Sequence, residues 1–497
     1  MRLPIPVALI LICFSTALPQ SKPVVEDKGN FGLFVVNDYI NQYQYLEREN
    51  QLLLIGSKNL QLLDLTNFKV VETRPLVLPF RDRRPNYLDM DWPIRPDGRY
   101  MVLLGLYVLR TKTKTEDKQA ASIIDLQTGK RVALLDHPDL IRTAMWSKNG
   151  KTLMTMDHFY IDSLTRTLNV SFWDGETFEH RHSVTVENVT WIYLSNDGER
   201  FFAASGKGKS LLGIKYVSDS NSVVRIWKTR SGELEKTIAV GDAQYQPKTR
   251  EIGISPDEKF LLMVNKHKSV SSEHRLLAWE INGDVTPKYE LRPQPKIDDS
   301  RVEFSPDGRY FALDVGRNLQ IYETGTGKLK VELENVELPS WGWLDNDVLA
   351  SVDYKQKNFF EQGKILKAFN ANDGQLLFKQ RLEYDEIERP SYTGNGDETV
   401  VVTDTSLRPH PTRKIFLTVS DLFVKIYDSR TGALLQTVVH PLIRYDKMGK
   451  PKMTHGDTVH SAGWSKDGNT LYVFSANNTA VSLWRLIDYT DKKTDLR

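Results

Sequence analysis

Short apolar segments alternate with polar turns along nearly the whole chain, and a recurring phrase organises them. The phrase is an apolar run, Ser-x-Asp-Gly, a second apolar run, an aromatic residue and a Thr-Gly-Lys-like turn. It is clearest from Ser305-Pro306-Asp307-Gly308 through Tyr322 to Thr326-Gly327-Lys328. Self-similarity at a period of roughly 40–50 residues, built of short strands, indicates a repeat architecture.

Further copies of this phrase cover most of the remaining chain. Each predicts one antiparallel sheet, because apolar β-forming residues lie on both sides of a tight turn that contains Gly, Asp or Asn. One such sheet cannot bury both of its faces, whereas sheets stacked radially can, so the pattern predicts a β-propeller. The other copies contain Asp64, Asp97-Gly98, Asn149-Gly150, Asp197-Gly198, Asp257, Asp345, Gly394-Asn395-Gly396 and Asp467-Gly468.

The phrase resembles the WD40 repeat. Trp173-Asp174 is a literal Trp-Asp pair at the expected place, and a His precedes the first strand in two units. The resemblance implies that the characteristic His, Trp, Tyr and Asp positions of the repeat stabilise the fold. It also implies that the protein is an interaction scaffold. The positions assigned to this structural role are His137, Trp173, Asp174, Trp227, Trp279, Tyr322, Tyr427, His455 and Trp484.

The expected fold is therefore all-β, a single WD40-like β-propeller of eight or nine four-stranded blades. It extends over residues 31–487 and is followed by a polar tail at 488–497. The final unit ends without a last strand, and Phe31 to Val36 is the candidate N-terminal strand that closes the ring, because closure removes exposed strand edges. The first unit lacks an Asp-Gly turn, which favours eight blades over nine.

The amino terminus has the order of a secretory signal peptide, assigned to residues 1–20. Met1-Arg2 is followed by a mainly apolar stretch from Leu3 to Leu18 and then by a polar segment. This stretch is short for a membrane span, although a retained anchor is the alternative. The only cysteine, Cys13, lies within it, so the mature chain would have no thiol chemistry. An exported chain without disulfides is expected in a bacterial periplasm or outside the cell.

Composition adds little evidence for chemistry. The chain is 40% hydrophobic with a formal net charge of +2, which gives no support for nucleic-acid binding. His455, Asp457 and His460 form a His-x-Asp-x-x-His cluster that could hold a metal, but their positions are also explained by the repeat. No Gly-x-Ser-x-Gly elbow or phosphate-binding loop is present. The sequence thus predicts no cofactor and no enzyme activity.

Several of the hairpins that join the second and third strands of a unit are extended and basic. In WD40-like propellers these hairpins lie on one ring face with the connections between blades, so the sequence predicts a basic face and an otherwise acidic molecule. Two interpretations remain open, a surface for an anionic partner and a set of simply solvated lysines. The candidate binding residues are Arg110, Lys112, Lys114, Lys207, Lys209, Lys266, Lys268, Lys355, Lys357, Arg408, Arg413, Arg444 and Lys447.

These observations predict an exported, non-enzymatic scaffold that binds another protein or an envelope polyanion through its basic face. The alternative is a propeller enzyme, or a binder of a small molecule or metal, that uses the central channel.

Overall fold

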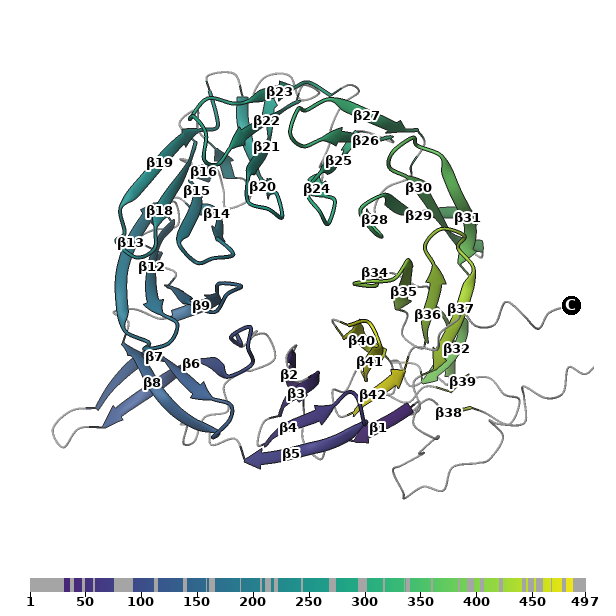
Figure 1. Cartoon of the computed structure of the whole chain (residues 1–497), viewed down its shortest axis with the longest axis horizontal. Helices are drawn as coiled ribbons and strands as arrows, with labels where there is room; N and C mark the ends of the chain where they lie inside the picture. Colours follow the sequence, from purple (N-terminus) through teal and green to yellow (C-terminus); the bar gives the residue numbers. More distant parts are fainter. Residues whose placement is uncertain are drawn as a thin grey trace, which may run out of the picture.

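The computed structural model describes residues 31–485 with internal breaks, of which the longest covers residues 76–92. The signal-peptide prediction and the polar tail lie outside these residues. Every regular element that the structure describes is a β-strand, and the strands form a ring of nine blades around a central channel (Figure 1). The predicted WD40-like β-propeller is confirmed.

Each blade is an antiparallel sheet whose first strand lies at the channel and whose last strand lies outside (Figure 1). The first five blades are formed as follows: blade 1 by β2 (Ile40–Leu46), β3 (Gln51–Gly56), β4 (Asn59–Asp64) and β5 (Lys69–Pro75); blade 2 by β6 (Tyr100–Arg110), β7 (Thr115–Asp125) and β8 (Lys130–Asp136); blade 3 by β9 (Ile141–Trp146), β10 (Thr152–Asp157), β12 (Arg166–Asp174) and β13 (His180–Glu187), with β11 (Phe159–Tyr160); blade 4 by β14 (Val189–Leu194), β15 (Arg200–Ser205), β18 (Val223–Lys228) and β19 (Leu234–Ala239); blade 5 by β20 (Tyr245–Ile254), β21 (Phe260–His267), β22 (His274–Glu280) and β23 (Tyr289–Leu291).

The remaining four blades repeat this arrangement. They are formed as follows: blade 6 by β24 (Val302–Phe304), β25 (Tyr310–Val315), β26 (Asn318–Glu323) and β27 (Leu329–Leu333); blade 7 by β28 (Ser340–Trp343), β29 (Val348–Asn358), β30 (Glu361–Asn370) and β31 (Leu376–Leu382); blade 8 by β34 (Ser406–Pro409), β35 (Ile415–Val419), β36 (Phe423–Asp428) and β37 (Leu434–Val439); blade 9 by β40 (Val459–Trp464), β41 (Thr470–Ser475), β42 (Ala480–Arg485) and β1 (Phe31–Val35). In blade 2 the inner position is taken by residues 93–95, which bond to β6 through the Ile94–Met101 bridge.

Ring closure depends on the first strand of the chain. β1 pairs antiparallel with β42 from Phe31–Trp484 to Val35–Ala480 and supplies the fourth strand of blade 9, as predicted. The preference for eight blades is wrong, because residues 40–75 form a complete blade of their own. That blade manages without an Asp-Gly turn because Asn50 adopts the left-handed conformation, with φ 49°, which asparagine tolerates better than most residues.

The repeated turn phrase is a self-contained hydrogen-bonded unit. In blade 6 the Ser305 hydroxyl donates to Asp307 Oδ1 at 2.8 Å, and the same hydroxyl accepts the backbone N–H of Tyr310 at 3.0 Å. Gly308 closes the turn at φ 72°, a conformation in which any side chain would be strained. Partial burial alone would raise the pKa of Asp307, but its hydrogen bonds with Arg309 and Ser305 lower that pKa overall.

The core lies between adjacent blades. One cluster combines Phe172 of blade 3 with Phe201 and Trp227 of blade 4, and others join the remaining neighbours in the same way. The structural-repeat aromatics occupy one equivalent position near the end of the third strand. Among them Trp173, Trp227, Trp279, Tyr322 and Tyr427 are buried, whereas Trp484 is half-buried. Asp174 accepts a hydrogen bond from Arg181 at 2.7 Å, and His137 and His455 lie outside the described residues.

The interpretation of Gly394-Asn395-Gly396 as a turn of the repeat is wrong. The strands that flank residues 391–396, β32 (Asp385–Pro390) and β33 (Asp397–Val402), pair with each other outside the ring. The turn of blade 8 comes later, between β34 and β35, and there His410 stands where other units have Ser.

His410 forms this turn as a neutral ring. Its Nδ1 accepts the backbone N–H groups of Thr412 and Arg413 at 3.1 and 2.9 Å, and its Nε2 donates to the Gly468 carbonyl at 2.8 Å. The ring packs edge-on against Trp464 with 4.8 Å between centroids. Burial, together with the nearby charge of Arg413, lowers the pKa of His410 below its usual value.

Removing the closing strand should open the ring. A chain that begins at residue 36 loses the five β1–β42 pairs, and we expect its free energy of unfolding to fall by more than about 2 kcal/mol, since each lost backbone hydrogen bond contributes about 0.5–1.5 kcal/mol. The exposed edge of β42 should also promote self-association. The matched control begins at residue 31. Equal melting and equal elution of the two chains in size-exclusion chromatography would contradict this role of β1.

The His410→Ser variant should change how stability depends on pH. Because the pKa of His410 is lowered on folding, only the unfolded chain takes up this proton as pH falls below about 6.5. The free energy of unfolding that neutral His410 contributes is therefore fully present above that pH and is lost progressively below it. We expect H410S to be about 1–3 kcal/mol less stable than the native chain at pH 8. Urea unfolding at several pH values should show this gap narrowing towards pH 5, and a constant gap would contradict the assignment.

Candidate functional site: the hairpin face of the ring

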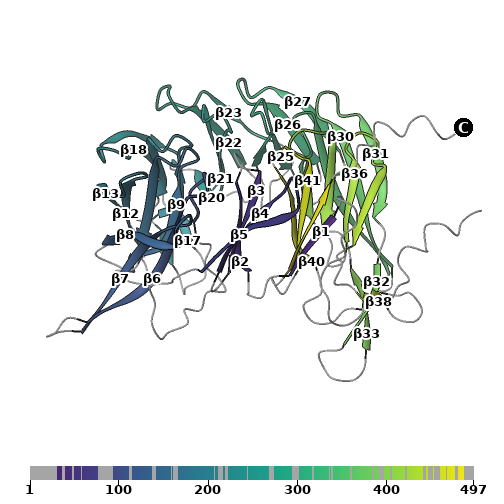
Figure 2. The same cartoon turned by 60° about the horizontal axis from the view of Figure 1, so that its bottom comes forward.

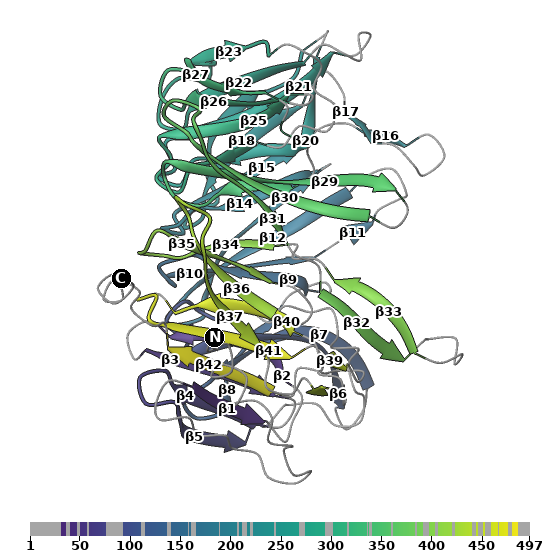
Figure 3. The ribbon, with the colours of Figure 1, turned by 90° about the vertical axis from the view of Figure 1, so that its right-hand side faces the viewer.

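Antiparallel topology divides the loops of the ring between two faces. The hairpins between the second and third strands share one face with the connections between blades, and the shorter turns share the other. We call these the hairpin face and the turn face. Figure 3 shows the extended hairpins projecting towards one side of the ring, among them β6–β7 and β29–β30, and Figure 2 shows them from a second direction.

The hairpin face carries structure that the ring does not need. β6 and β7 pair without a break from Tyr100–Asp125 to Arg110–Thr115. In blade 4, a small hairpin of β16 (Gly208–Ser210) and β17 (Tyr216–Ser218) forms a sheet separate from its blade. These extensions increase the surface that the face presents to other molecules.

The largest addition is a four-stranded sheet made from two connections between blades. The β32–β33 hairpin leaves the chain between blades 7 and 8, and the short strands β38 (Arg444–Tyr445) and β39 (Pro451–Lys452) leave it between blades 8 and 9. A parallel bridge between Glu388 and Lys452 joins the two halves. We call this the added sheet. The added sheet projects from the hairpin face beside blades 8 and 9 (Figures 2 and 3).

The structure places most of the described candidate binding residues on this face. Lys266, at the end of β21, is half-buried. Of the others, Arg110 ends β6, Lys209 lies in β16, Lys355 and Lys357 lie in β29, and Arg444 lies in β38. Lys112, Lys114, Lys207, Lys268 and Lys447 lie outside the described residues.

Arg408 and Arg413 were assigned to the hairpin face, and this placement is wrong. Arg408 lies in β34, the innermost strand of blade 8, and its side chain is exposed. Arg413 lies in the turn that follows, on the turn face, where it donates to Asn469 Oδ1 at 3.1 Å. Both errors follow from taking residues 394–396 as the turn of this unit, which exchanged the two faces for the segment after it.

The added sheet brings acidic residues to the hairpin face. β32 and β33 carry Asp385, Glu386, Glu388, Asp397 and Glu398 against a single Arg389. At the base of the blade 5 hairpin, Arg275 is largely buried, and its guanidinium forms ion pairs with Asp242 and Glu290. It also lies 4.1 Å from the centroid of the Tyr245 ring. The strands of this face therefore carry residues of both charges.

The structure bears on two other predicted features. Among the described side chains, no group of three His, Cys, Asp or Glu residues is arranged to hold a metal. The His455 and Asp457 positions lie outside that part of the chain, so the cluster with His460 is untested. Within the same described residues, no helix is long and apolar enough to cross a membrane.

Comparison with known proteins identifies the fold. A solved structure described as a eukaryotic initiation factor matches with 10% identity and a TM-score of 0.54. The match covers 82% of this chain and 89% of that one. The chain has a WD40-like β-propeller fold. No family model matches it, and no curated protein matches it.

Two further solved propeller-like structures are more distant. The C-terminal WD40 domain of Sif2 matches with 12% identity and a TM-score of 0.43, over 92% of this chain and 98% of that one. Dihydro-heme d1 dehydrogenase NirN in complex with DHE matches with 16% identity and a TM-score of 0.41, over 71% of this chain and 66% of that one. These two TM-scores are too low to support any inference about function.

Sequence reasoning missed the added sheet, although a local signal for half of it exists. Asn395-Gly396 between two runs that contain β-forming residues is a strong hairpin signal. The pairing of that hairpin with β39 has no comparable local signal, because the two segments are far apart in the sequence.

Proposed function

We propose that this protein is an interaction scaffold that holds a protein partner on its hairpin face. The added sheet is the observation that carries the proposal. The nine blades pair and close without it, so its strands are not needed to bury the core. It is built jointly by two separate connections and extends the same face as the long hairpins, which is where a scaffold would contact another macromolecule.

The charge pattern favours a protein over a polyanion. A polyanion would be attracted to β29, with Lys355 and Lys357, but repelled by the acidic β32–β33 hairpin. A folded protein can match both signs at once, and such complementarity speeds association and suppresses wrong partners. The partner is therefore expected to present acidic and basic patches at separate places.

We also propose that the scaffold works outside the cytoplasm. The support is the apolar stretch from Leu3 to Leu18 between Met1-Arg2 and a polar segment, which has the order of a secretory signal. Removal of this stretch would leave β1 close to the new amino terminus, in its place as the closing strand.

Two charge-reversed variants test the proposal. One carries Lys355→Glu and Lys357→Glu on β29, and the other carries Asp397→Lys and Glu398→Lys on β33. We expect both to weaken capture of the partner from native secreted and envelope fractions by about tenfold, a loss of about 1.4 kcal/mol. Wild-type capture should also fall as salt rises, because exposed charges are screened.

A matched control reverses charge on the turn face, with Lys148→Glu and Lys328→Glu at two exposed positions. This control should capture the partner as well as the native chain does. A gain of binding by the β33 variant together with a loss by the β29 variant would indicate a polyanion instead. Undiminished capture by both hairpin-face variants would refute a hairpin-face contact.

A further inference from the structure

The outer-strand contact between blades 1 and 2 differs from that of several other seams of the ring. In several blades, the positive-φ glycine of the turn after the third strand packs on a side chain near the start of the preceding blade's outer strand. Thus Gly232 faces His182, Gly327 faces Tyr289 and Gly432 faces Phe378. Gly129 of blade 2 instead faces the carbonyl of Pro75, the last residue of β5. The two blades are therefore offset at their outer strands only, because at the inner turn Gly98 packs on Leu46 as Gly468 packs on His410 in another seam.

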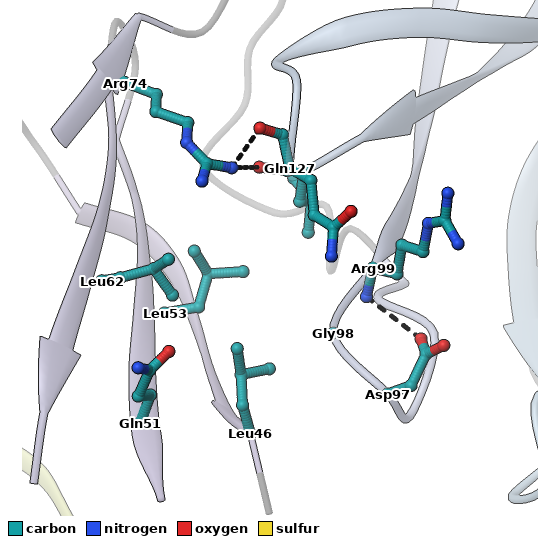
Figure 4. A pocket seen from close by; sticks show the side chains of 10 residues that line it. Leu46, Gln51, Leu53, Leu62, Arg74, Asp97, Gly98, Arg99 and Gln127 are labelled. Carbon is teal, nitrogen blue, oxygen red and sulfur yellow. Dashed lines mark hydrogen bonds between the residues drawn. The ribbon is translucent and has the colours of Figure 1, made fainter. Parts of the chain in front are cut away.

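A cavity of about 280 Å³ lies between the two blades beside these contacts. Leu46, Leu53 and Leu62 of blade 1 point into it from one side, as Figure 4 shows. Leu126 of blade 2 also lines it. Leu46, Leu53 and Leu126 are buried and Leu62 is half-buried, so the wall is apolar and held by the core of the two blades.

The charged groups at this cavity are already engaged. Arg74 pairs with Glu72 and donates to the carbonyls of Leu126 and Gln127. Asp97 forms an ion pair with Arg95 at 2.9 Å and accepts the backbone N–H of Arg99 at 3.0 Å. In Figure 4 the Arg99 guanidinium points away from the leucines. A ligand with a net charge would find no unneutralised partner within the cavity.

Two neutral amides are the groups left for recognition. Gln51 and Gln127 line the cavity, and within the described part of the chain neither side-chain amide has a hydrogen-bond partner. The Gln127 side chain projects between the leucines and the Asp97–Arg99 turn (Figure 4). Each primary amide offers donors and an acceptor, which is the complement of a peptide group.

We propose that this seam binds a peptide segment through one aliphatic anchor residue. The anchor side chain would lie against Leu53 and Leu62, and its peptide groups would exchange hydrogen bonds with Gln51 and Gln127. The volume is slightly below the ~300–1,000 Å³ of typical small-molecule pockets, which suits one side chain better than a cofactor. Buried anchors of this kind carry much of the energy of protein interfaces. Apart from Arg74, which lies near the far end of β5, the site is lined by residues at or near the turn-face ends of both blades, away from Lys355, Lys357 and the added sheet.

The test uses N-acetyl-L-leucinamide as the probe, detected by saturation-transfer NMR on the full chain. We expect it to bind, whereas N-acetyl-L-alaninamide lacks the anchor and zwitterionic leucine carries charges, so both should bind at least about tenfold more weakly. Leu62→Phe fills the cavity and should abolish the signal. Gln127→Leu removes one amide at an exposed position and should weaken binding without disturbing the fold.

Two control variants test whether the probe binds at the cavity between blades 1 and 2. Leu376→Phe makes the same change at an exposed leucine in blade 7 and should bind the probe normally. The Lys355→Glu, Lys357→Glu variant should also bind it normally, even if partner capture fails. No binding of N-acetyl-L-leucinamide, equal binding by Leu62→Phe, or equal binding of zwitterionic leucine would each overturn the proposal. A thermal melt of each variant confirms that the comparison is between folded proteins.

Discussion

The pairing of β1 with β42 is the interaction on which the rest of the ring depends. A blade has two apolar faces, and each is buried only by the blade beside it. The cluster between blades 9 and 1 shows the apolar surface that closure buries, since Leu52 and Leu54 of blade 1 contact Phe474, Val481 and Leu483 of blade 9. If the ring were open, two faces of this kind would be exposed together with two strand edges. Closure therefore stabilises every seam indirectly, by fixing where each blade lies.

Three of the seams share a second kind of contact, in which a side chain of one outer strand donates to one or two backbone carbonyls of the next blade. Arg74 reaches Leu126 and Gln127, Lys236 reaches Ile281 and Gly283 at 2.7 and 2.6 Å, and the Tyr289 hydroxyl reaches Thr324 at 2.7 Å. The side chains differ while the acceptor position is equivalent. Such bonds hold blades together without demanding identical packing, which lets the blade 1–2 seam keep its offset and its cavity.

The sequence was sufficient for the fold because each blade is specified locally. The Ser305–Asp307 unit, for example, contains its own hydrogen bonds, and its Gly308 supplies the conformation that the turn requires. The errors arose where local pattern was ambiguous. Residues 385–402 alternate and turn like a pair of blade strands, and only their distant partner β39 shows that they lie outside the ring. His410 was missed because it takes the serine position with a different set of hydrogen bonds, in which its ring accepts the N–H groups of Thr412 and Arg413, and such a replacement has no sequence signature.

Ring closure also constrains the order in which this protein acquires its shape. The strand nearest the amino terminus is made first but must wait for β42, one of the last segments to be synthesised. Bringing together segments separated by nearly the whole chain is entropically costly, and folds dominated by such distant contacts form slowly. Until that moment, a partly assembled arc would expose blade faces that favour aggregation. The ring can thus close only after β42 has been made, so blade 9 is assembled from the two most distant strands that the structure describes.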